Sequence, residues 1–308
     1  MHWKRLQILQ ENKNKERKDT MKNLSKYLEG MGRSLDATAW DILTTTDKRR
    51  ELAVKTAKAC WASYRDKNGF AYSAPSLFTH PANQAKLGKS DTYTLGLTIQ
   101  HADVSGYETC AWRTASCTAT CVLDNGNGRY DRVQHARNVK TQFLHDHPNE
   151  FIVLLVDEII RTASKYDDVL VRMNVNSDLR WYAIIPSLFD GSHMNIVNVG
   201  FYDYTKNPAV LRGNGIIAPK YRLCYSLSEN DARRMNKVDN FVGNGGTVAV
   251  VTIRKKSEQP PTAWRDRPVV DGDITDDRYA ERGVFVDLTA KGKARKLPVG
   301  GFVRDIKV

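Results

Sequence analysis

Three of the chain's five cysteines, Cys110, Cys117 and Cys121, lie within a run of twelve residues. Thiolates are preferred ligands of both iron–sulfur clusters and Zn²⁺, so this spacing predicts a metal site. Three thiolates can hold three irons of a [4Fe–4S] cluster and leave the fourth iron open to a substrate or cofactor. They can equally hold Zn²⁺ if a fourth ligand, such as His101 or His135, completes a tetrahedral site. Free cysteines also fill buried loops as small apolar side chains, so a structural role stays open beside the two metal sites.

The cysteine count also indicates the cellular compartment of the protein. The remaining two cysteines are Cys60 and Cys224, which makes the total odd, and no apolar stretch of signal-peptide type follows the basic residues near the N-terminus. An odd number of cysteines without a secretory signal is typical of reduced thiols in the cytoplasm. We therefore expect a cytoplasmic protein with thiols that are free to bind a metal.

Strands and helices alternate along the chain around the cysteine run. Strands are predicted at 93–99, 169–174, 195–204, 221–227, 247–253 and 283–288, and helices at 36–65, 130–145, 148–166, 181–189 and 230–241. Such alternation is typical of βα units and a parallel sheet. The strand number and the length favour a single (β/α) barrel of the TIM type, irregular or incomplete in places, over an open doubly wound sheet. No G-x-G-x-x-G follows the first strand, which argues against a dinucleotide-binding Rossmann site.

Polar residues follow the predicted strands at the end where active sites gather in such folds. The candidates are Asn174, Ser177, Asp178, Lys206, Glu229 and Asp271. Each one alone has an ordinary explanation as a helix N-cap or as part of a turn. Their occurrence after successive strands predicts a polar rim that faces the cysteine run.

The chain resembles a phage-encoded family named only after a mycobacteriophage gene product, over roughly residues 90–308. The resemblance rests on motifs in a fixed order: Cys110-x6-Cys117-x3-Cys121, Arg172-Met-Asn174-Val-Asn-Ser177-Asp178, Phe201-Tyr-Asp-Tyr-Thr-Lys206, Tyr225-Ser-Leu-Ser-Glu229, Val270-Asp271-Gly-Asp273 and Leu288-Thr-Ala-Lys291-Gly. It implies a phage or prophage setting, and hence the host cytoplasm, more firmly than it implies an activity.

Three cysteines after the first strand of a barrel are also similar, more distantly, to the radical S-adenosylmethionine enzymes. In those enzymes three thiolates hold a [4Fe–4S] cluster, and its open iron binds the amino and carboxylate groups of S-adenosylmethionine. They typically show Cys-x3-Cys-x2-Cys, whereas the gaps here are longer. The similarity implies that the three cysteines ligate the cluster. It implies cofactor binding by Asn174, Ser177 and Asp178, and substrate orientation or proton transfer by Lys206, Glu229 and Asp271.

Composition sets the limits on the partners. The 308 residues carry a net charge of +12, and the longest apolar run, 151–156, is far short of the roughly 20 residues that cross a membrane. Residues 1–26 form a basic leader, helical or disordered, with eight Lys and Arg against three Asp and Glu, and residues 27–308 form a single domain. Translation can start at Met1 or Met21. A solvated leader explains part of the charge, and contact with nucleic acid or a nucleotide explains the rest.

Two further classes of function stay open from the residues themselves. A metal-dependent nicking nuclease or replication initiator would use His145 and His147 as metal ligands and Tyr202 as its nucleophile. It leaves the three cysteines without a role. A zinc-stabilised nucleic-acid-binding protein without catalysis explains the charge and the cysteines but not the polar rim. The sequence does not set the oligomeric state.

Overall fold

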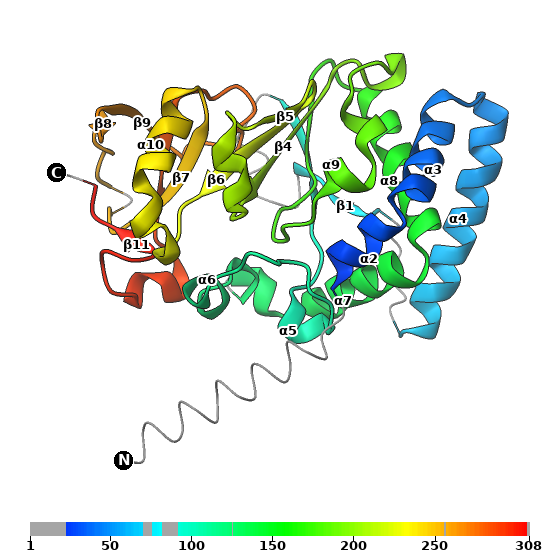
Figure 1. Cartoon of the computed structure of the whole chain (residues 1–308). Helices are drawn as coiled ribbons and strands as arrows, with labels where there is room; N and C mark the ends of the chain where they lie inside the picture. The colour runs from blue at the N-terminus through cyan, green and yellow to red at the C-terminus, as the bar shows by residue number, and fades with distance from the viewer. Residues whose placement is uncertain (1–22, 70–75, 82–91, 125, 256, 307–308) are drawn as a thin grey trace.

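The computed structural model describes residues 23–69, 76–81, 92–124, 126–255 and 257–306 (Figure 1). Most of the predicted basic leader, residues 1–22, lies outside this part of the chain. The described part begins just before helix α2 (Leu24–Gly30), whose N-cap Asn23 accepts a hydrogen bond from the backbone N–H of Lys26.

All six predicted strands are present and pair in parallel with their neighbours along the chain. They are β2 (Tyr93–Leu97), β3 (Val169–Arg172), β4 (Val199–Thr205), β6 (Tyr221–Ser226), β7 (Thr247–Thr252) and β10 (Val284–Thr289). The order β2-β3-β4-β6-β7-β10 follows the sequence, as in a (β/α) barrel, whereas a doubly wound sheet reverses its order midway. The predicted α/β class with a parallel sheet is confirmed.

Shorter strands extend this sheet at both ends, and two others pair with the interior strands β6 and β7. Strand β1 (Phe78–Thr79) pairs antiparallel with β2, and β5 (Ile216–Ala218) pairs antiparallel with β6. At the other end β9 (Arg267–Asp271) is parallel to β10, and β8 (Ala263–Trp264) is antiparallel to β9. Strand β11 (Val303–Arg304) is parallel to β7. Among the described residues, hydrogen-bonded strands form a continuous series from β1 at one edge to β8 at the other, and these two edge strands do not pair with each other. Closure of the barrel therefore stays a prediction.

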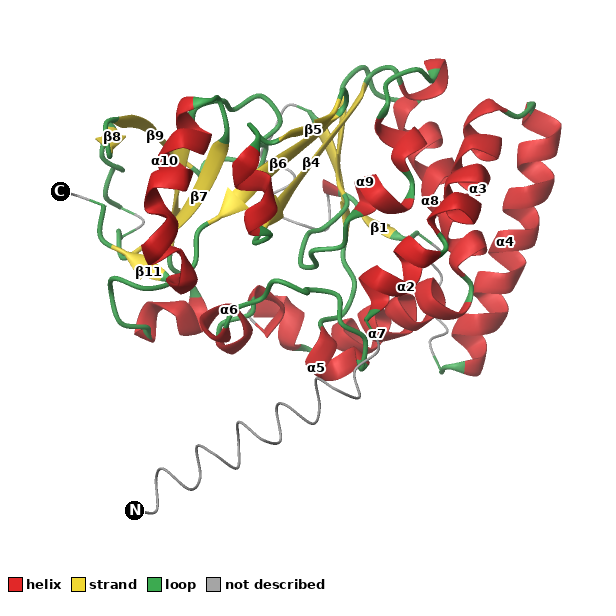
Figure 2. Cartoon of the chain, in the orientation of Figure 1, coloured by secondary structure: helices red, strands yellow, loops and turns green. Residues whose placement is uncertain are grey.

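Most long helices gather beside one part of the sheet (Figure 2). They are α3 (Gly32–Thr44), α4 (Asp47–Lys67), α7 (Asp131–Asp146) and α8 (Pro148–Ala163). Helix α8 packs on both α3 and α4 and also contacts β3, so it is buried along nearly its whole length. This burial explains its run of apolar residues, because a helix covered on all sides has no polar face to expose.

The single helix predicted at 36–65 is wrong: α3 ends at Thr44 and α4 starts at Asp47. Three consecutive threonines stand at the break, where Thr45 and Thr46 are extended. Their β-branched side chains lose rotamer freedom inside a helix, and Thr46 is well suited to the N-cap position that it takes. The break lets the two helices pack side by side on α8.

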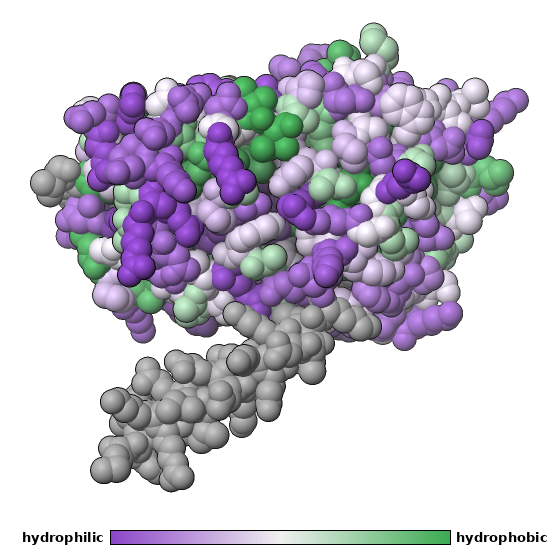
Figure 3. All heavy atoms as spheres, in the orientation of Figure 1, coloured by the Kyte–Doolittle hydropathy of each residue, from purple (hydrophilic) through white to green (hydrophobic). Residues whose placement is uncertain are grey.

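The remaining helices are short and lie in the connections. They are α5 (Ala102–Ser105), α6 (Ala115–Ala119), α9 (Trp181–Ile184) and α10 (Met235–Gly243). Among the described residues no helix combines the length and the apolar character needed to cross a membrane. Figure 3 shows hydrophilic residues over most of the face that it presents.

Candidate functional site

The cysteine run lies across the carboxyl ends of the parallel strands. Cys117 is in α6, and Cys110 and Cys121 flank that helix. The Cys110 thiol lies 3.4 Å from the backbone oxygen of Asn176, which follows β3. The backbone N–H of Asp178 donates to the oxygen of Thr109 at 2.8 Å. The predicted placement of the cysteines at this edge of the sheet is therefore observed.

Burial and charged residues of the polar rim shift the pKa values of two of the three thiols. Burial raises the pKa of Cys110 well above its ordinary value, and the charges of Asp178, Cys117 and Cys121 raise it further. Burial also raises the pKa of Cys117, against the opposing charge of Lys206 and with added effects of Asp178 and Glu229. We call these six residues the cysteine site. Without a metal, Cys110 and Cys117 are protonated at neutral pH, so metal binding must displace protons.

The sulfurs are not gathered as tightly as in a zinc site. Across the described part of the chain, the three sulfurs are not all within 4.8 Å of one another and do not form such a set with a His, Asp or Glu donor. Zn–S bonds of about 2.3 Å in a tetrahedron hold sulfurs about 4 Å apart. His135, one possible fourth ligand, instead places its Nε2 3.0 Å from the backbone oxygen of Asn68.

Asp178 and Lys206 link the ends of β3, β4 and β6. The carboxylate of Asp178 accepts hydrogen bonds from the Thr205 hydroxyl at 2.7 Å and the Lys206 N–H at 2.9 Å. Burial raises the pKa of Asp178 to about 6, although these hydrogen bonds and the charge of Lys206 oppose the rise. The ammonium of Lys206 donates to the Ser226 hydroxyl at 2.8 Å and lies 5.0 Å from the centre of the Phe302 ring. The Lys206 ammonium is thus held in a fixed position, from which its charge lowers the pKa of Cys117.

Glu229 anchors the helix that carries Cys117. Its carboxylate accepts hydrogen bonds from the Thr114 hydroxyl and the Ser116 N–H, both at 2.8 Å. Thr114 is the N-cap of α6, and its hydroxyl accepts from the N–H of Cys117 at 3.3 Å. Burial acts to raise the pKa of Glu229, but hydrogen bonds from Ser116, its own N–H and Thr114 hold it below its ordinary value. The predicted substrate or proton role stays a prediction beside this anchoring role.

Asn174 and Ser177 are buried and use their polar atoms to shape the loop after β3. The amide oxygen of Asn174 accepts from the Ser177 hydroxyl at 2.7 Å and from the Leu179 N–H at 3.0 Å. Its amide nitrogen donates to the backbone oxygen of Leu179 at 2.9 Å. Their predicted role in cofactor binding is not tested by these contacts, which hold the loop that carries Asp178.

Asp203, in the middle of β4, organises this edge of the sheet and was not among the predicted site residues. Its fully buried carboxylate accepts from the Asn174 N–H at 2.6 Å and from the Tyr221 hydroxyl. Burial raises its pKa to about 7. The sequence signal for it was a carboxylate inside an otherwise apolar and aromatic strand, which a parallel sheet rarely accepts without buried partners.

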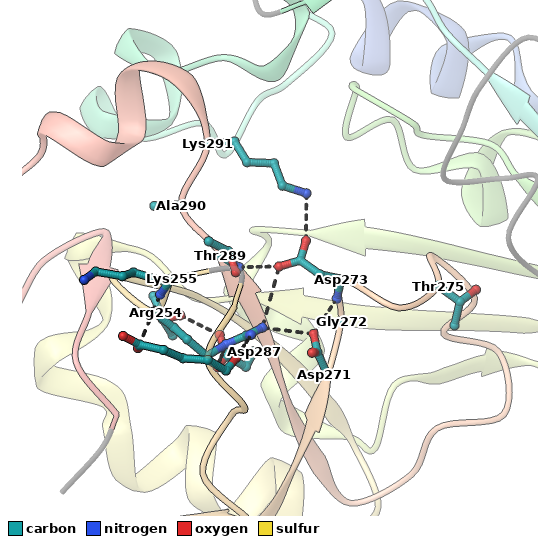
Figure 4. A network of polar contacts seen from close by, with 12 residues as sticks. Arg254, Lys255, Asp271, Gly272, Asp273, Thr275, Asp287, Thr289, Ala290 and Lys291 are labelled. Carbon is teal, nitrogen blue, oxygen red and sulfur yellow. Dashed lines mark hydrogen bonds and ion pairs between the residues drawn. The ribbon is translucent and has the colours of Figure 1, made fainter.

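Asp271 belongs to a separate ionic group around Arg254, shown in Figure 4. Arg254 follows β7 and is 4% exposed, and it donates to Asp271 at 2.9 Å and to Asp287 at 2.8 Å. Asp273 lies 3.7 Å from Arg254 and accepts from Lys291 at 2.7 Å. We call these five residues the Arg254 cluster. The prediction that Asp271 handles substrate or protons stays untested, and its carboxylate is held by Arg254.

The nuclease alternative requires an accessible tyrosine, and Tyr202 is buried. Tyr202 is 1% exposed on β4, its hydroxyl has no partner among the described residues, and burial raises its pKa well above the ordinary value. His145 stacks on Tyr27 and lies 2.7 Å from Asp146, at the end of α7. A nucleophilic tyrosine needs access to DNA and an acceptor for its proton, and the described residues give Tyr202 neither.

A family model described as Gene product 88 matches residues 73–301 of the chain. This range covers about three quarters of the sequence and includes the cysteine site and the Arg254 cluster. No curated protein and no solved structure matches the chain.

Proposed function

The chain belongs to the gene product 88 family, and we propose that it is a phage-type iron–sulfur protein that works as a radical S-adenosylmethionine-like enzyme. The observation that carries this proposal is the placement of Cys110, Cys117 and Cys121 in and beside α6, in a segment that meets the carboxyl edge of the parallel sheet. Active sites of (β/α) folds lie at this edge, and three thiolates leave one iron of a [4Fe–4S] cluster open.

The donor set fits such a group in number, chemistry and setting. When bound, the cluster supplies electrons and an open iron for the amino and carboxylate groups of S-adenosylmethionine. The three thiolates would add negative charge to a buried site, and the charge of Lys206, which lowers the pKa of Cys117, offsets part of it. Glu229 fixes α6 and thereby the position of Cys117. Asp178, with a pKa of about 6, can gain or lose a proton near neutral pH.

The substrate class we propose is nucleic acid or a nucleotide. Its support is the net charge of +12, because Lys and Arg in excess favour contact with phosphate groups. The fixed ammonium of Lys206 lies within the cysteine site, where a substrate phosphate would meet a positive charge.

Metal analysis of the chain purified without oxygen tests the proposal. We expect iron and acid-labile sulfide in the wild type, a broad visible absorption, and loss of both elements in Cys117→Ala. Cys224→Ala is the matched control, because Cys224 is buried in β6 and lies outside the cysteine site. Zinc in place of iron that is lost in Cys117→Ala would overturn the proposal and support a zinc-stabilised protein instead.

A further inference from the structure

A second group of metal-binding atoms lies where α4 meets the start of α8, outside the cysteine site. The Sγ of Cys60, a ring nitrogen of His147 and a carboxylate oxygen of Glu150 all lie within 4.8 Å of one another. All three residues are half-buried. Among the described residues, no other three His, Cys, Asp or Glu side chains bring their donor atoms this close.

The backbone fixes the two donors at the start of α8. His147 stands between α7 and α8, where its N–H donates to the oxygen of Phe143 at 2.8 Å and its own oxygen accepts from Phe151 at 3.0 Å. Pro148, the first residue of α8, restricts the backbone at the same point. Glu150 follows His147 by three residues, a spacing that places both side chains on one side of a helix start.

Two aromatic rings hold the His147 ring toward Cys60. Tyr64, one turn after Cys60 on α4, meets the His147 ring edge-on with centroids 5.4 Å apart, and Phe143 lies at the same distance. The Nδ1 of His147 is 3.5 Å from the Sγ of Cys60. A ring held by packing on two sides keeps its nitrogen aimed at the thiol, which is the preorganisation that a metal ligand needs.

The geometry points to a transition-metal site, and we propose that Cys60, His147 and Glu150 bind Zn²⁺ or a metal of similar preference. Sulfur, imidazole nitrogen and carboxylate oxygen are the three ligand types of zinc, with bonds of about 2.0 to 2.3 Å. A tetrahedral ion therefore holds its donors about 3.5 Å apart, so movements of about 1 Å complete the site. The charges of a thiolate and a carboxylate balance those of Zn²⁺.

The nearby groups leave one position on the metal to water or to a substrate group. Asp146, the nearest further carboxylate along the chain, is held by the Tyr64 hydroxyl at 2.6 Å and by His145 at 2.7 Å. Burial and the charge of Glu150 raise the pKa of Cys60, whereas the charge of Lys67 lowers it and so favours the thiolate. Three protein ligands with an open fourth position are the arrangement of catalytic zinc sites. The bound metal also joins α4 to α8.

Titration with Co²⁺ alone, a coloured substitute for Zn²⁺, tests this site. It is carried out on the full chain with Cys110, Cys117 and Cys121 changed to serine, so that the cysteine site does not contribute. We expect one equivalent of Co²⁺ with a thiolate-to-metal absorption band. Cys60→Ser and His147→Ala should each weaken Co²⁺ binding by more than roughly 10- to 100-fold, because that is the loss expected when a residue that contacts only a metal ligand is removed.

Controls make every outcome informative. Glu51→Gln, which alters an exposed carboxylate on α4, should leave Co²⁺ affinity unchanged, whereas Glu150→Gln should lower it. Absence of the band in the folded triple variant, or a band unaffected by Cys60→Ser, overturns the proposal. If the triple variant does not fold, zinc per chain is compared between the wild type and Cys60→Ser. A fall of one equivalent supports the site, and equal zinc overturns it. Neither result depends on whether the cysteine site holds a cluster.

Discussion

Removing the carboxylate of Glu229 should loosen the cysteine helix while leaving the sheet intact. In Glu229→Ala, the Thr114 hydroxyl and the Ser116 N–H each lose a charged acceptor at 2.8 Å. A hydrogen bond to a charged group contributes about 1.5 to 3 kcal/mol, and water replaces part of it at a half-exposed site. We therefore take the lower value for each bond and expect local destabilisation of about 3 kcal/mol.

Hydrogen exchange measures this local effect directly. A loss of about 3 kcal/mol corresponds to roughly 100-fold faster exchange of amides that open locally. We expect this acceleration in peptides that cover Thr114 to Cys121, and no change in peptides from β7, which carries neither of the two donors to the Glu229 carboxylate. Mass spectrometry of exchanged peptides resolves the two regions.

The control is Glu51→Ala, which removes an exposed carboxylate from α4. It should leave exchange in the cysteine helix unchanged. Unchanged protection of that helix in Glu229→Ala would refute the anchoring role and leave Glu229 as a residue for substrate or protons. Equal acceleration in β7 would also refute it, because the effect would then be global unfolding.

Three further variants test the electrostatics. Arg254→Ala leaves the buried Asp287 carboxylate without its cation and should cost about 3 to 5 kcal/mol in urea unfolding, whereas Arg265→Ala, from an exposed pair, should cost less than about 1 kcal/mol. The pKa of Asp203 is about 7 in the folded state, which is above its value in the unfolded chain. The native state therefore binds more protons than the unfolded state between about pH 4 and 7, and the free energy of unfolding falls as pH rises through that range. Asp203→Asn should remove about 2 kcal/mol of this pH dependence between about pH 5 and 7.5, and an unchanged slope would contradict the raised pKa. Lys206→Met removes the charge that lowers the pKa of Cys117, so the Cys117 thiol of the metal-free chain should be alkylated more slowly, as measured by mass spectrometry. Equal alkylation rates would place Lys206 outside the cysteine site.

The parallel sheet could be predicted from the sequence because each strand is a short apolar run between helices. The β7 strand illustrates this, since Thr247 to Thr252 is almost wholly buried and carries β-branched residues. The break between α3 and α4 was missed because helix-forming residues stand on both sides of it, and only the threonines marked it. Local helix propensity predicts the end of a helix poorly when tertiary packing, here on α8, determines where the helix ends.

The candidate site was predicted in part. Residues that follow strands, such as Asp178 and Lys206, meet the cysteines because all parallel strands end at one edge. Asp271 also follows a strand, but it pairs with Arg254. Strand order does not define such side-chain contacts, so the sequence could not show which rim residues pair with one another. Cys60 and His147 are 87 residues apart, and they meet only through the packing of α4 on α8. No spacing in the sequence could have indicated that pair.

Electron paramagnetic resonance tests the claim that three thiolates hold a cluster with one open iron. The chain is isolated without oxygen, reduced with dithionite, and measured at low temperature before and after addition of S-adenosylmethionine. We predict a reduced-cluster signal that changes when S-adenosylmethionine is added, and no signal from Cys117→Ala. A folded wild-type chain with no cluster signal, or a signal that S-adenosylmethionine leaves unchanged, would contradict the claim.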